Sequence, residues 1–253
     1  MMRLSWIVPV AAMAATGACT VISPTETKTY GNSGFDSISA SSGVDIVLKQ
    51  GPFAVSATAP SDRIDRIVIE QEGSLLKISQ KPDMRWFSWS EREIVTVAAP
   101  VWVSITATGG ADIDVEGGVT GKDLSITTSG GADIKAADFS LNSLTLKASG
   151  GADVDAKNFT LVSLTATTGG GADLNISGTC KTAEIEASGG GDVEGGDFKC
   201  ETATVSARSG GDVSLTVSGT AAGKASGGGD IRFHGNPAVV QRDETSGGDV
   251  TAD

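Results

Sequence analysis

Short apolar–polar alternations run through the second half of the chain. Examples are Leu124-Ser-Ile126, Leu144-Thr-Leu146 and Val205-Ser-Ala207. Alternation with a period of two indicates strands with one buried face, and no apolar stripe with the 3.6-residue period of a helix accompanies it. A less regular alternation predicts further strands within residues 44–49, 53–57, 67–70, 75–79, 94–98 and 101–107. The pattern therefore predicts an all-β protein.

A phrase of two glycines and an aspartate returns about every twenty residues between these strands, first as Gly109-Gly110-Ala111-Asp112. Its eight aspartates are Asp112, Asp133, Asp153, Asp173, Asp192, Asp212, Asp230 and Asp249. Glycine allows the positive φ of a sharp turn. A unit of two or three short strands cannot bury its own apolar face, so we expect units to stack, with each strand parallel to its copy. The sequence predicts a right-handed parallel β-helix, a solenoid with coils of about 20 residues.

The repeated aspartates are the first candidate for chemistry. Stacking would bring equivalent carboxylates to about 4.8 Å from one another, where like charges repel. Each carboxylate either accepts hydrogen bonds from its own glycine turn or shares a cation with its neighbour, and calcium takes oxygen ligands of this kind. We favour the turn-cap role. No metal, phosphate-binding or nucleophile motif is found, so no catalytic residue and no cofactor other than this alternative calcium is expected.

Four other side chains stand out as candidates. Cys180 and Cys200 share one position of the repeat, so they form either a disulfide or two buried thiols, and the sequence leaves both open. Trp86 and Trp89 lie outside any alternating stretch, where they would stack on sugar rings or pack against the fold. His234, the single histidine, is interpreted as a loop residue and not as a catalytic base.

The first residues predict export. Arg3, an apolar run and a few small residues are typical of a signal peptide over residues 1–18. Cys19 then stands where a bacterial lipoprotein carries its lipid anchor; plain secretion is the alternative. We expect a tether over 19–33, irregular coils that cap the β-helix over 34–108, and the regular β-helix over 109–253. The predicted location is the cell envelope, lipid-anchored in the outer membrane or periplasm, or outside the cell.

Composition restricts the partners. Nineteen basic and 31 acidic side chains give a net charge of −12, which argues against nucleic acid because phosphate binding needs basic patches. It also argues against an anionic membrane surface, so membrane contact is expected only through the lipid anchor. With 34 glycines and 5% aromatic residues, the chain lacks the large side chains of a compact enzyme core.

From about Phe35 to Val250 the chain resembles the head GIN domain family, described as putative auto-transporter adhesins of the bacterial envelope. The resemblance rests on Phe35-Asp36-Ser37-Ile38, on Ser42-Gly43-Val44-Asp45-Ile46 and on the serial Gly-Gly-Ala-Asp phrases. The segment near residue 86 departs from the family pattern. The resemblance implies a β-helix, export and an adhesive surface role, and it transfers no catalytic residue.

Three functions are therefore considered. The first is a non-enzymatic exported binding module for a cell-surface polysaccharide or an envelope protein. The second is a structural envelope component that self-associates through its terminal coil, where unpaired strand edges invite pairing. The third is a carbohydrate-active β-helix enzyme, a lyase or glycosidase, since close carboxylate pairs could serve as acid and base.

Overall fold

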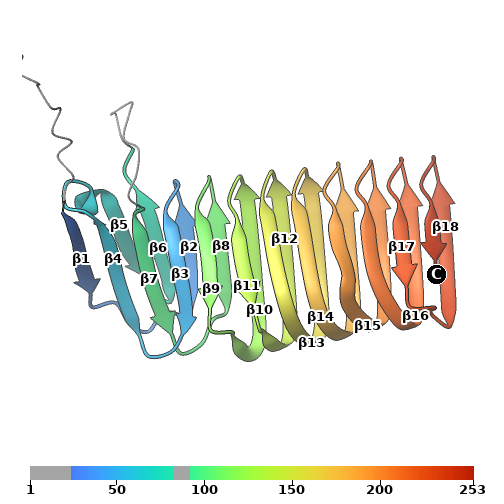
Figure 1. Cartoon of the computed structure of the whole chain (residues 1–253), viewed down its shortest axis with the longest axis horizontal. Helices are drawn as coiled ribbons and strands as arrows, with labels where there is room; N and C mark the ends of the chain where they lie inside the picture. The colour runs from blue at the N-terminus through green and yellow to red at the C-terminus, as the bar shows by residue number, and fades with distance from the viewer. Residues whose placement is uncertain (1–23, 83–91) are drawn as a thin grey trace, which may run out of the picture.

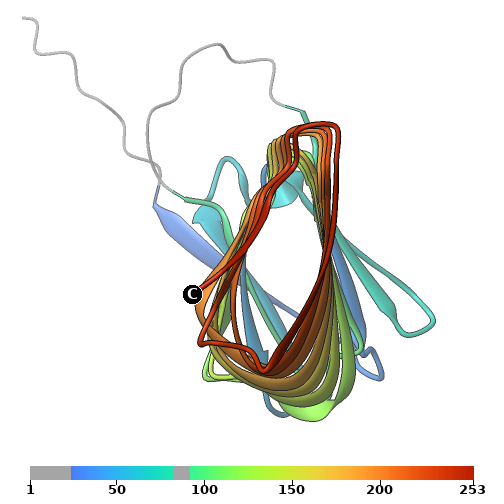
Figure 2. The same cartoon turned by 90° about the vertical axis from the view of Figure 1, so that its right-hand side faces the viewer.

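A computed structural model describes residues 24–82 and 92–253 and confirms the parallel β-helix (Figure 1). Each regular coil runs down one long face and back up the other, as two shorter strands in some coils and as one long, bent strand in others, and the glycine turns line up along one edge (Figure 1). Seen along its axis, the solenoid has a flattened, elongated cross-section (Figure 2). The predicted signal peptide, Cys19, Trp86 and Trp89 lie outside the described residues.

The elements before the regular coils are short. They are β1 (Thr25–Tyr30), β2 (Ser37–Ser41), β3 (Asp45–Gln50), β4 (Ala54–Pro60), the 3-10 turn η1 (Ile64–Arg66), β5 (Ile67–Glu72), β6 (Leu75–Gln80) and β7 (Ile94–Ala99). The regular coils contain β8 (Ser104–Thr108), β9 (Asp112–Glu116), β10 (Thr120–Gly130), β11 (Ile134–Ala137), β12 (Ser140–Gly150), β13 (Asp153–Gly170), β14 (Asp173–Ser188), β15 (Val193–Arg208), β16 (Val213–Ser226), β17 (Ile231–His234), β18 (Val239–Thr245) and β19 (Val250–Ala252).

The first coils do not stack in chain order. Strand β2 pairs in parallel with both β6 and β8, and β3 pairs in parallel with both β7 and β9. The coil formed by β2 and β3 is thus inserted between two coils that follow it in sequence. Antiparallel pairing of β1 with β4, of β4 with β7 and of β5 with β6 then extends the N-terminal end.

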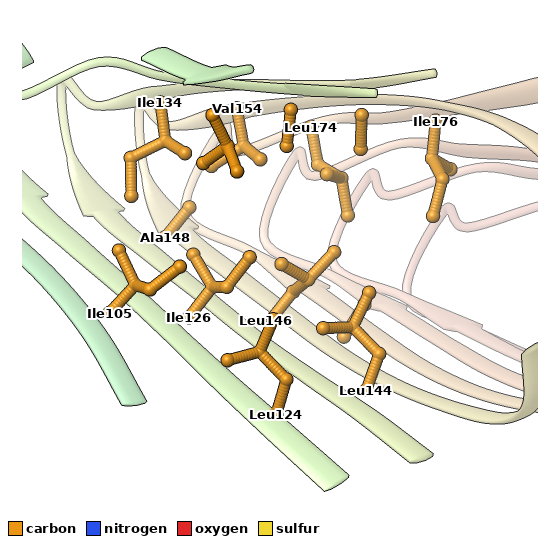
Figure 3. Close-up of a cluster of buried hydrophobic side chains, with 14 of the residues drawn as sticks. Ile105, Leu124, Ile126, Ile134, Leu144, Leu146, Ala148, Val154, Leu174 and Ile176 are labelled. Atoms are coloured by element: carbon orange, nitrogen blue, oxygen red, sulfur yellow. The ribbon is translucent and has the colours of Figure 1, made fainter. Parts of the chain in front are cut away.

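The interior is built from columns of equivalent apolar side chains. Figure 3 shows Ile134, Val154 and Leu174 on one sheet facing Ile126 and Leu146 on the other, and all five are at most 3% exposed. Each coil places a side chain directly against its copy in the next coil, about 4.8 Å away. Burial of these apolar surfaces is what stabilises the stack, since a coil alone has no interior.

The bend opposite the glycine turns contains a column of aromatic rings with one gap. The rings of Phe139 and Phe159 stack with centroids 4.5 Å apart and planes 5° from parallel. The next register position is Gly178, and Phe198 follows it. Gly178 has a φ of +129°, and a Cβ there would lie 2.0 Å from the carbonyl oxygen of Phe159. The backbone of this coil approaches its neighbour too closely for any side chain.

Candidate functional site

The repeated aspartates form one continuous file on the outer surface of one long face, where each coil leaves its glycine turn. Register pairs Asp153 with Asp173, and it also pairs Asp112 with Asp45 of β3. We call the nine equivalent residues the aspartate ladder, namely Asp45, Asp112, Asp133, Asp153, Asp173, Asp192, Asp212, Asp230 and Asp249. Asp45 was not predicted from the sequence as a member of this set, although Ser42-Gly43-Val44-Asp45 is a degenerate copy of the repeated Gly-Gly-Ala-Asp phrase.

Four of the nine ladder carboxylates bond to the next coil, and not to their own glycine turn as expected. In four neighbouring pairs of the ladder, Oδ1 of the first aspartate accepts a hydrogen bond from the backbone N–H of the second, at 2.9 to 3.3 Å. These pairs, with the accepting carboxylate first, are Asp133 and Asp153, Asp192 and Asp212, Asp212 and Asp230, and Asp230 and Asp249. This corrects the expected partner. One strand spacing is within reach of an aspartate side chain, and a charged acceptor strengthens the bond.

Asp45 shows the electrostatic cost of the ladder. Burial raises the pKa of its carboxyl, and the negative charge of Asp112 raises that pKa further, while Arg92 lowers it. Desolvation and a like charge both disfavour the ionised form of an acid. The other ladder members project into solvent on at least one side, which weakens the repulsion between neighbours.

Three open hollows follow the ladder along the solenoid. The first, of about 190 Å³, lies by Asp45 and Asp112. The second, of about 340 Å³, lies between Asp153 and Asp192 and also contacts Glu194. The third, of about 370 Å³, lies at the C-terminal end, and its ladder residues are Asp192, Asp212, Asp230 and Asp249. The ladder is therefore the floor of an interrupted groove lined with carboxylates.

The opposite face of the solenoid is rich in hydroxyl groups. A shallow hollow of about 730 Å³ lies over β13 to β16 on this face. Its polar lining is Ser163, Thr165, Thr182, Thr202, Thr204 and Thr220 with one acid, Glu184. The two long faces thus differ in charge: one is a row of carboxylates and the other is mainly neutral.

The two cysteines are joined. Cys180 and Cys200 are register partners on β14 and β15, with Cα atoms 4.5 Å apart, and their sulfurs form a disulfide. Both side chains are at most 6% exposed and belong to the apolar interior. Of the two alternatives that the sequence left open, the structure has the disulfide, because stacking in register brings the two Cβ atoms within bonding reach.

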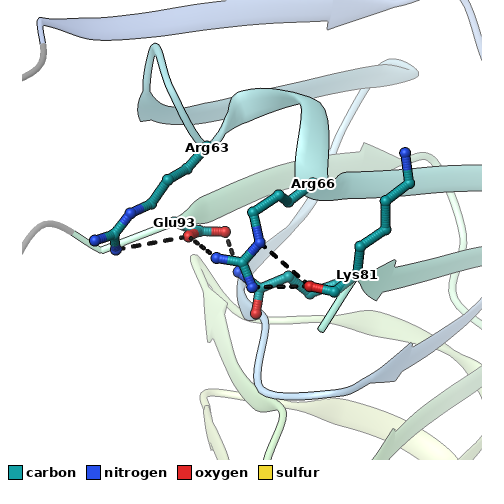
Figure 4. A network of polar contacts seen from close by, with 5 residues as sticks. Arg63, Arg66, Lys81 and Glu93 are labelled. Carbon is teal, nitrogen blue, oxygen red and sulfur yellow. Dashed lines mark hydrogen bonds and ion pairs between the residues drawn. The ribbon is translucent and has the colours of Figure 1, made fainter. Parts of the chain in front are cut away.

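A buried ion network holds the N-terminal region together (Figure 4). The carboxylate of Glu93, 8% exposed, lies 3.4 Å from Nη1 of Arg66 and 3.9 Å from Nη1 of Arg63, and it also accepts a hydrogen bond from Gln80. Arg66 donates from Nε and Nη2 to the carbonyl oxygen of Lys81. One guanidinium therefore ties the end of β6 to the residue before β7. Trp86 and Trp89, expected either to stack on sugar rings or to pack against the fold, lie in the sequence between Lys81 and Glu93, outside the described residues.

His234 is not a loop residue, which corrects the interpretation from sequence. It ends strand β17, and its ring lies between two polar side chains. Nε2 is 3.1 Å from Oγ of Ser214, and Nδ1 is 2.8 Å from Oδ1 of Asp253. The sequence placed these three residues about twenty positions apart, so only the stacking of coils brings them together.

Two negative findings apply to the described part of the chain. No group of three or more His, Cys, Asp or Glu side chains within residues 24–82 and 92–253 is arranged to hold a metal ion. In the same residues, no helix has the length and apolar character needed to span a membrane.

Comparison with known proteins agrees with the fold. Residues 34–237 match the family model described as "Putative auto-transporter adhesin, head GIN domain". No curated protein matches the sequence. A solved structure of a putative adhesin from Parabacteroides merdae superposes with a TM-score of 0.77 at 17% identity, covering 90% of this chain and 96% of that one.

Two further solved structures are similar. A putative adhesin from Bacteroides fragilis has a TM-score of 0.66 at 18% identity, over 91% of this chain and 97% of that one. A putative lipid binding protein from Parabacteroides distasonis has a TM-score of 0.74 at 17% identity, over 90% and 96% of the two chains. At these identities the likeness establishes the fold alone.

Proposed function

The chain belongs to the head GIN domain family of putative auto-transporter adhesins, and from this premise we propose that it is an exported binding module of the cell envelope. Its partner is a cell-surface polysaccharide or an envelope protein, held against the aspartate ladder. The observation that carries the proposal is the file of nine equivalent carboxylates with hollows along it. Binding of this kind needs no catalysis.

The chemistry of the ladder defines the kind of partner. Carboxylate oxygens repeat about every 4.8 Å along the solenoid, so an extended chain with hydroxyl or ammonium groups can donate hydrogen bonds to several coils at once. A net charge of −12 disfavours a polyanion. The proposal is therefore a neutral or amino-bearing polysaccharide, or a basic surface of an envelope protein. Membrane contact is proposed only through a lipid on Cys19; the tether expected over residues 19–33 is shorter than predicted, because Thr25–Tyr30 forms strand β1 and pairs with β4.

Binding to a glycan array and pull-down from envelope extracts test this proposal. The variant D153N/D173N removes two adjacent charges from the middle of the ladder and should weaken binding at least tenfold. Its matched control is T145A/T165A, two register partners on the hydroxyl-rich face, which should bind as the natural chain does. Equal binding by all three proteins would refute the role of the ladder. If W86A/W89A loses binding while D153N/D173N binds as the natural chain does, the binding site lies in the tryptophan segment and not on the ladder.

Self-association through the terminal coil is disfavoured by charges at inward positions. Arg242 and Glu244 of β18 are the register partners of Gly223 and Ala225, which face the interior. Glu244 also accepts a hydrogen bond from the backbone N–H of Val250, at 3.0 Å. Inward charges on an edge oppose edge-to-edge pairing. Light scattering should find monomers, and R242V/E244V should associate end to end; oligomers of the natural chain would contradict this.

A further inference from the structure

Three polar side chains on adjacent coils have the arrangement of an acyl-transfer site. The hydroxyl of Ser214 lies 3.1 Å from Nε2 of His234, and Nδ1 of the same ring lies 2.8 Å from the carboxylate of Asp253. Nucleophile, base and orienting carboxylate stand in this order in serine hydrolases of unrelated folds, which are recognised by geometry and not by sequence position. We propose that Ser214, His234 and Asp253 form a site that hydrolyses carboxylic esters.

The stacking of coils creates this order. Strands β16 and β17 pair Thr216 with His234, so Ser214 lies two residues away on the same outer face. Strands β17 and β19 pair Phe233 with Ala252, which places Asp253 beside His234. Diagonal neighbours on one face of a sheet are within reach of a long side chain. The imidazole therefore leans toward Ser214 while its other nitrogen meets Asp253.

Hydrogen-bond chemistry assigns the tautomer. An ionised carboxylate only accepts, so Nδ1 of His234 must donate its hydrogen to Asp253. The Nε2 of the neutral ring then has a free lone pair that accepts the hydroxyl hydrogen of Ser214. This is the protonation state in which the histidine can act as a general base toward the serine.

Ser214 lines two hollows, so a substrate has room beside it. One hollow, of about 370 Å³, contains the C-terminal part of the aspartate ladder, and the other, of about 580 Å³, lies toward Asn158 and Asp197. Arg232 is the register partner of Ser214 and lines the first hollow. A guanidinium at this place can stabilise the negative charge that develops on a carbonyl oxygen under attack.

The reaction is an ordinary acyl transfer to water. Oγ of Ser214 bonds to the ester carbonyl carbon while its proton passes to Nε2 of His234. The tetrahedral intermediate expels the alcohol, which takes that proton, and leaves an acyl-serine. A water molecule then gives a proton to Nε2 and adds to the acyl carbon, and the carboxylic acid departs as the serine oxygen regains the proton. Ester and water become acid and alcohol, with no other reactant.

The surrounding charges select the substrate class. Four ladder carboxylates line the hollow beside Ser214, namely Asp192, Asp212, Asp230 and Asp249. They repel anionic substrates, so the alcohol part of the ester is neutral or cationic, as in an acylated neutral or amino sugar. Esters are favoured over amides because a single side chain, Arg232, supplies the oxyanion support. The inference does not depend on the proposed binding function.

A fluorophosphonate probe and p-nitrophenyl acetate test the proposal on the full chain. The probe should label Ser214, and S214A and H234A should each lower hydrolysis by about 100-fold or more. The matched control is S226A at the other end of β16, which should change neither readout. Absence of labelling in the natural chain would overturn the proposal, and so would hydrolysis by S214A at the natural rate; unchanged melting temperatures show that each variant is folded.

Asp253 is a positioning residue because it acts through His234, so its test needs its own readout. D253N should slow probe labelling of Ser214 at least tenfold at an unchanged melting temperature, since an amide can hold the wrong tautomer. D253E, which restores a carboxylate, should recover part of the rate. Equal labelling of D253N and the natural chain would remove Asp253 from the site, and equal rates for D253N and D253E would do the same.

Discussion

Asp212 offers the clearest test of how the aspartate ladder is held together. Its backbone N–H donates to Oδ1 of Asp192 at 2.9 Å, and its own Oδ1 accepts from the backbone N–H of Asp230 at 2.9 Å. It therefore takes part in two bonds between coils and faces a like charge on each side. Asp212→Asn keeps an oxygen acceptor and removes the charge, whereas Asp212→Ala removes both.

The magnitudes follow from the spacing. Two unit charges about 4.8 Å apart repel by about 0.9 kcal/mol in water and about 3.5 kcal/mol at an effective dielectric of about 20. Asp212 is exposed, so the lower figure applies, and salt near physiological strength screens about half of it. Relief from two neighbours then makes D212N about 1 kcal/mol more stable. D212A loses the acceptor and should fall about 1 kcal/mol below D212N.

Urea denaturation at low and high salt is the assay. The free energy of unfolding of D212N should exceed that of the natural chain by less as salt rises, because salt screens the charge repulsion. The difference in free energy of unfolding between D212N and D212A should persist, because salt does not screen the loss of the hydrogen bond. Equal stabilities for D212N and D212A would refute the role of the hydrogen bond. A D212N variant less stable than the natural chain, together with destabilisation of the natural chain by a chelator, would mean that a cation such as calcium neutralises the ladder.

Three further predictions concern other parts of the fold. Replacing Cys180 and Cys200 by alanine should lower the free energy of unfolding by about 3 kcal/mol in the loop-closure model, and a reductant should lower the melting temperature of the natural chain only. Asp45→Asn should raise the melting temperature at neutral pH. The pKa of Asp45 is raised in the folded state, so the natural protein loses stability as pH rises through that pKa and the carboxyl ionises, whereas the amide does not ionise. Below about pH 2 the carboxyl is protonated, and the variant and the natural chain should melt alike. Gly178→Ala should prevent folding or cost several kcal/mol, since its Cβ would meet backbone at 2.0 Å, whereas Gly121→Ala would meet only a Leu141 methyl at 3.5 Å and should be nearly neutral by calorimetry.

Much of the architecture could be predicted from sequence because the repeat carries its own register. Once one coil stacks on the next, Asp153 must meet Asp173 and Cys180 must meet Cys200, and the alternation of side chains decides which residues face inward. The β-helix and the file of aspartates follow from this rule alone. The family resemblance pointed to the same fold and to the surface role.

Only the tertiary structure decided what lies outside the repeat. The insertion of β2 and β3 between later coils depends on their pairing with β6 and β7, which are joined by no copy of the repeated phrase, so no period in the sequence signals it. The bonds from four ladder carboxylates to the next coil, and the diagonal contact from Ser214 to His234, depend on the direction in which a side chain points once its neighbours are in place. Strand spacing and register are encoded locally, whereas contacts across them form only in the assembled stack.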